Sequence, residues 1–270
     1  MTGGAGGDQR AAEGPVEEEQ ARLKTLWRSR ALQHGARSVH SLRHRPEDYG
    51  EVTGLQSSIL LPLLRSCLTG RERRGLDFGC GSGRFSGAIA EALGRKGRPS
   101  LLAYDICQEL LDLAPPHPFV GYTSDFSLVE AEGAPRPFHL VWLCLVLGGL
   151  SDGLCASAGR ALSDLLDDGG RLFLVEPIGD VRSSNPIWNM RTLGDYQAMF
   201  PDVRLRHLGA YFDCGNEVTI LAVTKRPGLA AGLRVWTRYL HAEITLRLAQ
   251  IAGLHRRPRL RSIELDRHRR

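Results

Sequence analysis

The chain has 270 residues, of which 42% are hydrophobic and 24% are charged, a composition typical of a globular protein with one moderate domain or one domain with extra arms. Its 31 glycines show no three-residue period, which excludes a collagen-like chain. The longest apolar run, residues 140–150, is far below the ~20 apolar residues that a membrane-spanning helix needs. No membrane partner is therefore expected.

The formal net charge of +5 is distributed unevenly along the chain. Residues 1–20 carry a net charge of −4, whereas residues 256–270 carry seven arginines and a net charge of +5. The positive excess is therefore mostly a property of the C-terminal end. For this reason we do not expect a nucleic-acid partner for the folded body.

The six cysteines are scattered, and no two of them have C-x-x-C spacing. None is combined with a histidine at the spacing of a zinc site. A disulfide scaffold is therefore not expected, and no metal site is predicted. Reduced thiols of this kind are typical of a cytoplasmic protein, which is the predicted location.

In chain order, residues 1–20 are predicted to be a disordered leader, because they are rich in glycine, alanine and glutamate. Residues 21–70 are predicted to form an N-terminal helical lid. It would contain one helix over 21–36 and another over 52–68, interrupted or bent by Pro62.

Residues 71–226 show a regular alternation that predicts an α/β domain with a parallel, doubly wound sheet. The expected strands are 74–78, 101–104, 119–122, 140–145 and 171–175, and the expected helices are 84–94, 108–113 and 156–166. The stretch Asp167-Asp168-Gly169-Gly170 is a helix stop signal.

The pattern changes after Glu176. A largely helical insertion is expected at about 178–200, followed by strands at 203–211 and 218–224 joined by a hairpin-like connection. Residues 227–255 are predicted to be a C-terminal helix, and residues 256–270 form the basic tail.

The most informative segment reads Leu-Asp-Phe-Gly-Cys-Gly-Ser-Gly-Arg-Phe over residues 76–85. Gly79, Gly81 and Gly83 follow a predicted strand and precede a helix. Glycines let the backbone approach a ligand closely, and the free N–H groups of the helix N-terminus face that ligand. Asp77 lies two residues before the first of these glycines.

Two further acidic positions strengthen this interpretation. Asp105 ends the next strand, 22 residues after Gly83, where a carboxylate can bind a ribose diol. Asp125 and Phe126 follow the third strand, where a carboxylate and a ring could hold an adenine.

Two ligands compete for such a loop. A dinucleotide loop of the form G-x-G-x-x-G/A needs a third small residue, and here the two registers place Arg84 or Ser86 there. The spacing Asp77-x-Gly79-x-Gly81-x-Gly83 instead resembles motif I of the class I S-adenosylmethionine-dependent methyltransferases. The resemblance extends from about residue 76 to residue 225.

The resemblance implies a Rossmann-like, seven-stranded, mostly parallel sheet with an antiparallel last strand, here 218–224. It also implies S-adenosylmethionine as cofactor, with Asp105 on the ribose and Asp125 and Phe126 at the adenine. The implied cofactor-binding residues are Trp27, Arg30, Asp77, Gly79, Gly81, Gly83, Asp105, Ile106, Asp125, Phe126 and Leu143.

Residues 27–39 look like the helix that many small-molecule methyltransferases fold over the cofactor, with Arg30 placed to reach the methionine carboxylate. One departure is clear. Many relatives carry a histidine after the fourth strand, where this chain has Gly148-Gly149, so an acid or base role for that histidine is not carried over.

The sequence therefore predicts an S-adenosylmethionine-dependent methyltransferase that methylates a hydroxyl or amine of a small molecule, such as a sugar or secondary metabolite. Glu176, at the carboxyl end of a strand, and His207, in the sixth strand, are the candidate catalytic residues. Two alternatives stay open: an RNA or other macromolecule methyltransferase that uses the basic tail, and a cofactor-binding protein without activity. A homodimer is also left open.

Overall fold

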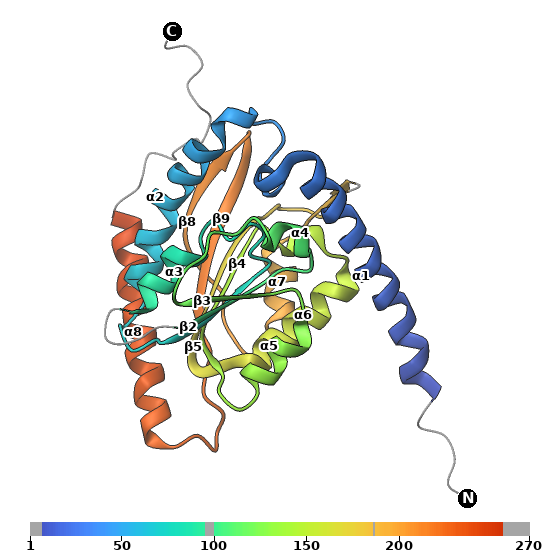
Figure 1. The fold of residues 1–270 in the computed structure, drawn as a ribbon. Helices are drawn as coiled ribbons and strands as arrows, with labels where there is room; N and C mark the ends of the chain where they lie inside the picture. Colours follow the sequence, from blue (N-terminus) through green and yellow to red (C-terminus); the bar gives the residue numbers. More distant parts are fainter. Residues whose placement is uncertain (1–6, 95–99, 186, 256–270) are drawn as a thin grey trace, which may run out of the picture.

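Seven strands form one sheet in the order β3-β2-β1-β4-β5-β9-β8. The computed structural model describes residues 7–94, 100–185 and 187–255 (Figure 1). The strands are β1 Arg74–Phe78, β2 Ser100–Tyr104, β3 Val120–Thr123, β4 Phe138–Cys144, β5 Leu166–Pro177, β8 Arg206–Asp213 and β9 Asn216–Thr224. Strands β1 to β5 pair in parallel, and β9 is antiparallel to both of its neighbours. The predicted fold class is confirmed.

Helices cover both faces of this sheet (Figure 1). Helices α2 Tyr49–Cys67, α3 Ser86–Leu93 and α8 Leu233–His255 pack on one face, and α5 Phe126–Gly133, α6 Asp152–Leu165 and α7 Leu193–Met199 pack on the other. The central strands are buried on both sides, as in β4, where Trp142 stacks on Phe173 of β5 at 4.8 Å between ring centroids. The topology brings the carboxyl ends of β1, β2 and β4 to one edge.

The N-terminal helix α1, Gly7–His34, runs along that edge and contacts α4, Gln108–Leu111 (Figure 1). The predicted disordered leader is therefore wrong for residues 7–20, which are helical, whereas residues 1–6 lie outside the described residues. Alanine and glutamate are strong helix formers, whereas the sequence interpretation took a segment rich in glycine, alanine and glutamate as disordered. Contacts with the rest of the protein hold it, since the Ser151 hydroxyl donates a hydrogen bond to Glu19.

Three other elements differ from the expectation. Helix α5 was not predicted, because its eight residues carry little amphipathic pattern; it starts at Asp125, whose carboxylate accepts the Ser127 N–H at 2.9 Å. Helix α2 continues through Pro62. Strand β5 begins at Leu166, directly after α6, so the expected stop signal is part of the strand.

The segment 178–200 is not mainly helical as predicted. Strands β6 Ser183–Asn185 and β7 Trp188–Met190 form a two-stranded hairpin, and only α7 is helical. The hairpin is fixed by long-range contacts, because the Trp188 indole lies against Gly148, where an added Cβ would come within 2.1 Å of the ring. Local sequence patterns do not report such contacts.

Two 3₁₀ helices, η1 Gly35–Val39 and η2 Pro46–Asp48, connect α1 to α2. The basic tail 256–270 lies outside the described residues. Among the helices that the structure describes, none is both long enough and apolar enough to span a bilayer.

Candidate active site

The turn after β1 takes a shape that only glycine adopts at low cost. Gly79, Gly81 and Gly83 have φ angles of +74°, +57° and +68°. An added Cβ would lie 2.5 Å from the Val146 side chain at Gly79 and 2.5 Å from Val39 at Gly81. The backbone at these two positions therefore lies as close to its neighbours as a bare main chain allows.

Asp77, just before the turn, is buried and accepts a hydrogen bond from the Ser86 hydroxyl at 2.7 Å. Burial raises the pKa of this carboxyl to about 7, against the opposing effect of the Ser86 hydrogen bond. Asp77 thus ties the end of β1 to the start of α3, and it also lines the cavity described below.

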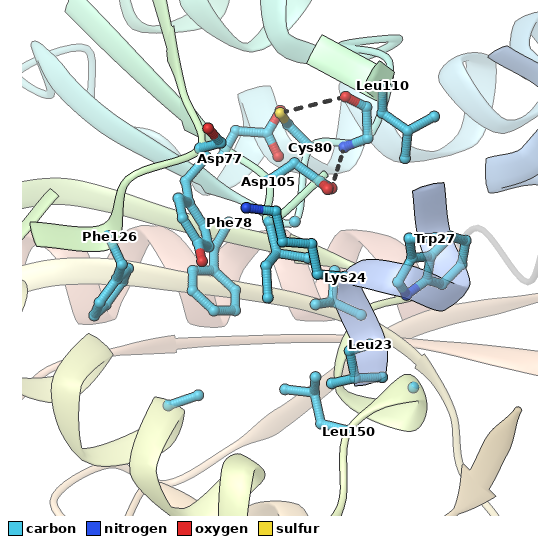
Figure 2. Close-up of a pocket in the computed structure, with 18 of the residues that line it drawn as sticks. Leu23, Lys24, Trp27, Asp77, Phe78, Cys80, Asp105, Leu110, Phe126 and Leu150 are labelled. Carbon is cyan, nitrogen blue, oxygen red and sulfur yellow. Dashed lines mark hydrogen bonds between the residues drawn. The ribbon is translucent and has the colours of Figure 1, made fainter. Parts of the chain in front are cut away.

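Asp105, at the end of β2, holds the glycine turn from the neighbouring strand. Its carboxylate accepts the Gly81 N–H at 2.8 Å, the bond drawn in Figure 2, and the Cys107 N–H at 2.9 Å. Burial raises the pKa of Asp105 to about 6, and the two N–H donors oppose that shift. A carboxylate offers about four lone-pair sites, so two remain for a ligand.

Three aromatic rings gather beside Asp105. Phe78 stacks on Tyr104 at 5.3 Å, and the edge of Phe126 meets both rings, at 6.0 Å from Phe78 and 5.3 Å from Tyr104. Asp125 is exposed at the rim, where it caps α5. This group provides an aromatic surface with one carboxylate at its edge.

Helix α1 provides the opposite wall. Figure 2 shows Lys24 extending from α1 toward Phe78 and Asp105, whereas Leu23 lies near Leu150; Trp27 of α1 also lines the cavity. Trp27 is held by Arg30, whose guanidinium lies 5.3 Å from the indole centroid and donates to the Ser38 carbonyl at 2.9 Å. Arg30 therefore connects α1 to η1.

These walls enclose one cavity of about 680 Å³. Among the residues that line it are Trp27, Asp77, Gly79, Gly81, Asp105, Ile106, Asp125 and Phe126, all predicted from the sequence as cofactor-binding residues. Further lining comes from residues that the sequence analysis did not identify, namely Glu17, Gln20, Lys24, Phe78, Arg84, Tyr104, Trp142, Val146 and Leu150.

Three of the predicted cofactor-binding residues do not line the cavity. Gly83 packs against Tyr122, whose hydroxyl would lie 2.9 Å from an added Cβ. Leu143 is fully buried in the core between the sheet and helices α5, α6 and α7. Arg30 stands behind Trp27, and its Nε is a buried nitrogen with no hydrogen-bond partner.

Glu176 is fully buried behind the loop that follows β4 and does not line the cavity. Its carboxylate accepts the N–H groups of Val146 and Leu147, both at 2.7 Å, and that of Gly148 at 3.4 Å. Burial raises its pKa to about 7, and the three N–H donors oppose that shift. These hydrogen bonds fix the backbone of the loop after β4, and the Glu176 carboxylate does not reach the cavity.

His207, the other candidate catalytic residue, is exposed on β8 and does not line the cavity either. Arg84 was seen in the sequence only as a mismatch to a dinucleotide motif. In the structure it lines the cavity, lies 4.2 Å from the Phe85 ring centroid and donates a hydrogen bond to the His40 ring at 2.8 Å.

Comparisons with known proteins identify the fold of this chain. No family model matches the sequence, and no curated protein matches it. Solved structures do. Magnesium protoporphyrin IX methyltransferase (ChlM) from Synechocystis PCC 6803 with bound SAH has a TM-score of 0.59 and 13% identity, covering 76% of this chain and 99% of that one.

The same enzyme with bound SAM gives a TM-score of 0.57 at 14% identity, with 76% of this chain and 96% of that chain covered. The DhpI–SAH complex gives 0.53 at 12% identity, with 77% and 98% covered. The chain therefore has the fold of the class I S-adenosylmethionine-dependent methyltransferases, which confirms the resemblance at the level of the fold.

Proposed function

We propose that this protein is an S-adenosylmethionine-dependent methyltransferase that acts on a hydroxyl or amine of a small molecule. One observation carries the proposal: two positive-φ glycines, the Asp105 carboxylate and an aromatic group line a single cavity of about 680 Å³. That volume lies within the range of ligand pockets. The structural neighbours bound to SAM or SAH support the proposed cofactor.

The residues present fit this cofactor. The bare backbone at Gly79 and Gly81 leaves no room for a side chain, and Asp105 keeps two free lone-pair sites for ribose hydroxyls. The rings of Phe78 and Phe126 would hold the adenine, with Asp125 at its edge. The unpartnered Arg30 Nε behind Trp27 supports the proposed role of Arg30 toward the methionine carboxylate, which would require a local shift of α1.

When bound, the sulfonium of the cofactor supplies an activated methyl group. The protein's part is to align the acceptor and to exclude water. Helix α1, the loop after β4 and the start of α6 close the cavity with apolar side chains, namely Leu23, Trp27, Leu145, Leu150 and Leu154. This apolar lining favours a secondary metabolite with an apolar body over a bare sugar.

For Glu176 we propose a positioning role instead of the expected catalytic one. Its carboxylate is occupied by the N–H groups of residues 146–148, so it fixes the wall of the acceptor side. We propose no catalytic role for His207, which is exposed outside the cavity. Removal of the acceptor's proton is assigned to no side chain.

We further propose that the protein is cytoplasmic, binds no nucleic acid and forms a homodimer. The homodimer is supported by the outward face of α8, which exposes Leu240, Ile244 and Leu248 by 53%, 57% and 61%. Exposed apolar stripes of this kind are common at interfaces between subunits.

Isothermal titration with S-adenosylhomocysteine tests the cofactor, and we expect one saturable site per chain. Transfer of a labelled methyl group from S-adenosylmethionine to members of an acceptor library then tests catalysis. Binding without transfer to any acceptor would favour a cofactor-binding protein without activity. Absence of binding, or preference for a nicotinamide dinucleotide, would contradict the proposal.

A further inference from the structure

A second cluster of chemically active side chains lies outside the cavity. His44 follows η1 in the connection from α1 to α2, and Asp213 and Cys214 lie at the turn from β8 to β9. The connection reaches the end of these two strands in Figure 1. Neither the glycine turn nor the cavity lining includes any of the three residues.

The three donor atoms converge. His44 Nε2 lies 2.6 Å from Asp213 Oδ1 and 3.3 Å from Cys214 Sγ, and all three ligand atoms lie within 4.8 Å of one another. His44 and Asp213 are buried, and Cys214 is half-buried. A third contact fixes the carboxylate, since the Gln56 amide donates to Asp213 Oδ2 at 3.3 Å.

A single imidazole nitrogen carries either one N–H or one lone pair, so His44 Nε2 serves either Asp213 or Cys214 in a hydrogen-bonded arrangement. In that arrangement the Cys214 thiol has Ser41 and Asp213 as side-chain partners. One cation between the three atoms would satisfy the nitrogen, the carboxylate and the thiolate together. A divalent cation with one carboxylate, one thiolate and a neutral imidazole also makes an electrically neutral buried site.

The donor set and the spacing select the kind of cation. Imidazole, thiolate and carboxylate are the ligands of zinc, which binds them at about 2.0 to 2.3 Å in tetrahedral geometry. That geometry places nitrogen and sulfur about 3.6 Å apart and nitrogen and oxygen about 3.4 Å apart. The observed N···S distance of 3.3 Å is close to the first value. The N···O distance of 2.6 Å has to open by about 0.8 Å as the metal replaces the proton.

The backbone at Cys214 points the same way. Cys214 has a φ of +50° and is followed by Gly215 at +80°, the conformation of a tight hairpin turn that asparagine and glycine usually occupy. A cysteine in this conformation costs about 1 kcal/mol or more in backbone strain. The conformation holds its thiol beside His44.

We propose that His44, Asp213 and Cys214 form a site for a zinc-type divalent cation, with solvent at the fourth position beside the half-buried Cys214. Zinc there ties the connection between α1 and α2 to the β8–β9 turn. That connection carries Val39, which lines the cavity and lies against Gly81. A cation at this site would therefore hold the connection that carries Val39 against the end of β8 and β9.

The sequence analysis predicted no metal because no cysteine and histidine lie at zinc-site spacing. Cys214 and His44 are 170 residues apart, and only the fold brings them together. The proposal is independent of the proposed methyltransferase activity, since its test measures metal binding directly.

The test is a titration of the chelator-treated full chain with Co²⁺, a spectroscopic substitute for zinc. We expect one equivalent to bind with a thiolate-to-cobalt charge-transfer band and the visible spectrum of a tetrahedral site, and zinc to displace it. Cys214→Ser should lose the charge-transfer band and more than about 100-fold in affinity, beyond the usual loss from an outer-shell change. Cys144→Ser, a half-buried cysteine on β4, is the matched control and should keep both.

Limited trypsin digestion gives the second readout. Zinc should slow cleavage after Arg43 in the wild type and leave the rate unchanged in Cys214→Ser, whose fold is checked by circular dichroism. Two results would overturn the proposal: no saturable binding near one equivalent, or a charge-transfer band that survives in Cys214→Ser. Either would make the His44–Asp213 contact a plain buried hydrogen bond.

Discussion

Two loops at the carboxyl edge of the sheet are built in opposite ways. The glycine turn at 79–83 owes its shape to positive-φ glycines and is held by Asp105 from the neighbouring strand. The loop after β4, residues 145–150, begins with Leu145, a non-glycine residue at a φ of +60°. Glu176 and Arg191 hold it in place from far along the chain.

Side chains from two other parts of the chain pair with the backbone N–H and C=O groups of the second loop. Glu176 accepts its N–H groups, and the buried Arg191 guanidinium donates to the carbonyls of Leu147 and Leu150, both at 2.7 Å. Both loops thus use a buried carboxylate as an acceptor for backbone N–H groups. Only Asp105 also faces the cavity. A carboxylate at the end of a parallel strand is therefore not by its position a catalytic base.

The largest effect is expected from removing the carboxylate behind the second loop. Glu176→Ala leaves the N–H groups of residues 146–148 buried without acceptors, which should lower the free energy of unfolding by about 3 kcal/mol or more. Urea denaturation measures it. Glu91→Ala, at an exposed position on α3, is the control and should stay within about 0.5 kcal/mol of wild type. Equal stabilities of the two variants would contradict the role assigned to Glu176.

The same carboxyl gives a pH signature. Burial raises the Glu176 pKa from 4.5 to about 7, so between these values the folded state holds more protons than the unfolded state. Stability is then greatest below about pH 4.5 and falls as the pH rises to about 7, by about 3 kcal/mol for this group. Glu176→Gln should show a pH dependence that is shallower by that amount in unfolding experiments across this window. Asp77 and Asp105, with pKa values raised to about 7 and about 6, share the direction and remain in the variant. Identical pH profiles would show that Glu176 titrates normally.

The glycine turn is not expected to tolerate a side chain at positions where its backbone packs closely against a neighbouring residue. Gly81→Ala combines a φ of +57° with a Cβ 2.5 Å from Val39, so S-adenosylhomocysteine affinity should fall by about 100-fold, or about 2.7 kcal/mol. Gly35→Ala is the matched control, since Gly35 has a φ of +58°, lies outside the cavity lining, and an added Cβ there meets nothing within 4 Å. Calorimetric titration compares the two. Similar affinities would mean that the ligand does not approach the glycine turn.

The contrast between the loops also explains what the sequence could predict. The glycine spacing and Asp105 depend on residues close together in the chain or on successive strands, and in the structure Gly79, Gly81 and Asp105 line one cavity. The roles of Glu176 and Arg191 could not be read, because the groups they contact lie about 30 and 40 residues away in sequence. The helical residues 7–20 were misjudged because their glycine, alanine and glutamate content was taken as a sign of disorder, although Glu17 and Gln20 line the cavity. His44 and Cys214 come together only in the folded chain, where the connection between α1 and α2 contacts the turn from β8 to β9.

The smallest expected effect is on ligand affinity, and it distinguishes the carboxylate of Asp105, which faces the cavity, from that of Glu176, which does not. Asp105→Ala should weaken S-adenosylhomocysteine binding by about tenfold, the scale of losing hydrogen bonds to a charged group. It also frees the Gly81 and Cys107 N–H groups, so some stability is lost as well. Glu176→Gln keeps an oxygen acceptor behind the other loop, and its affinity should stay within about twofold because Glu176 does not face the cavity. An unchanged affinity in Asp105→Ala would remove this residue from the ribose site and leave it, like Glu176, as a support for a loop.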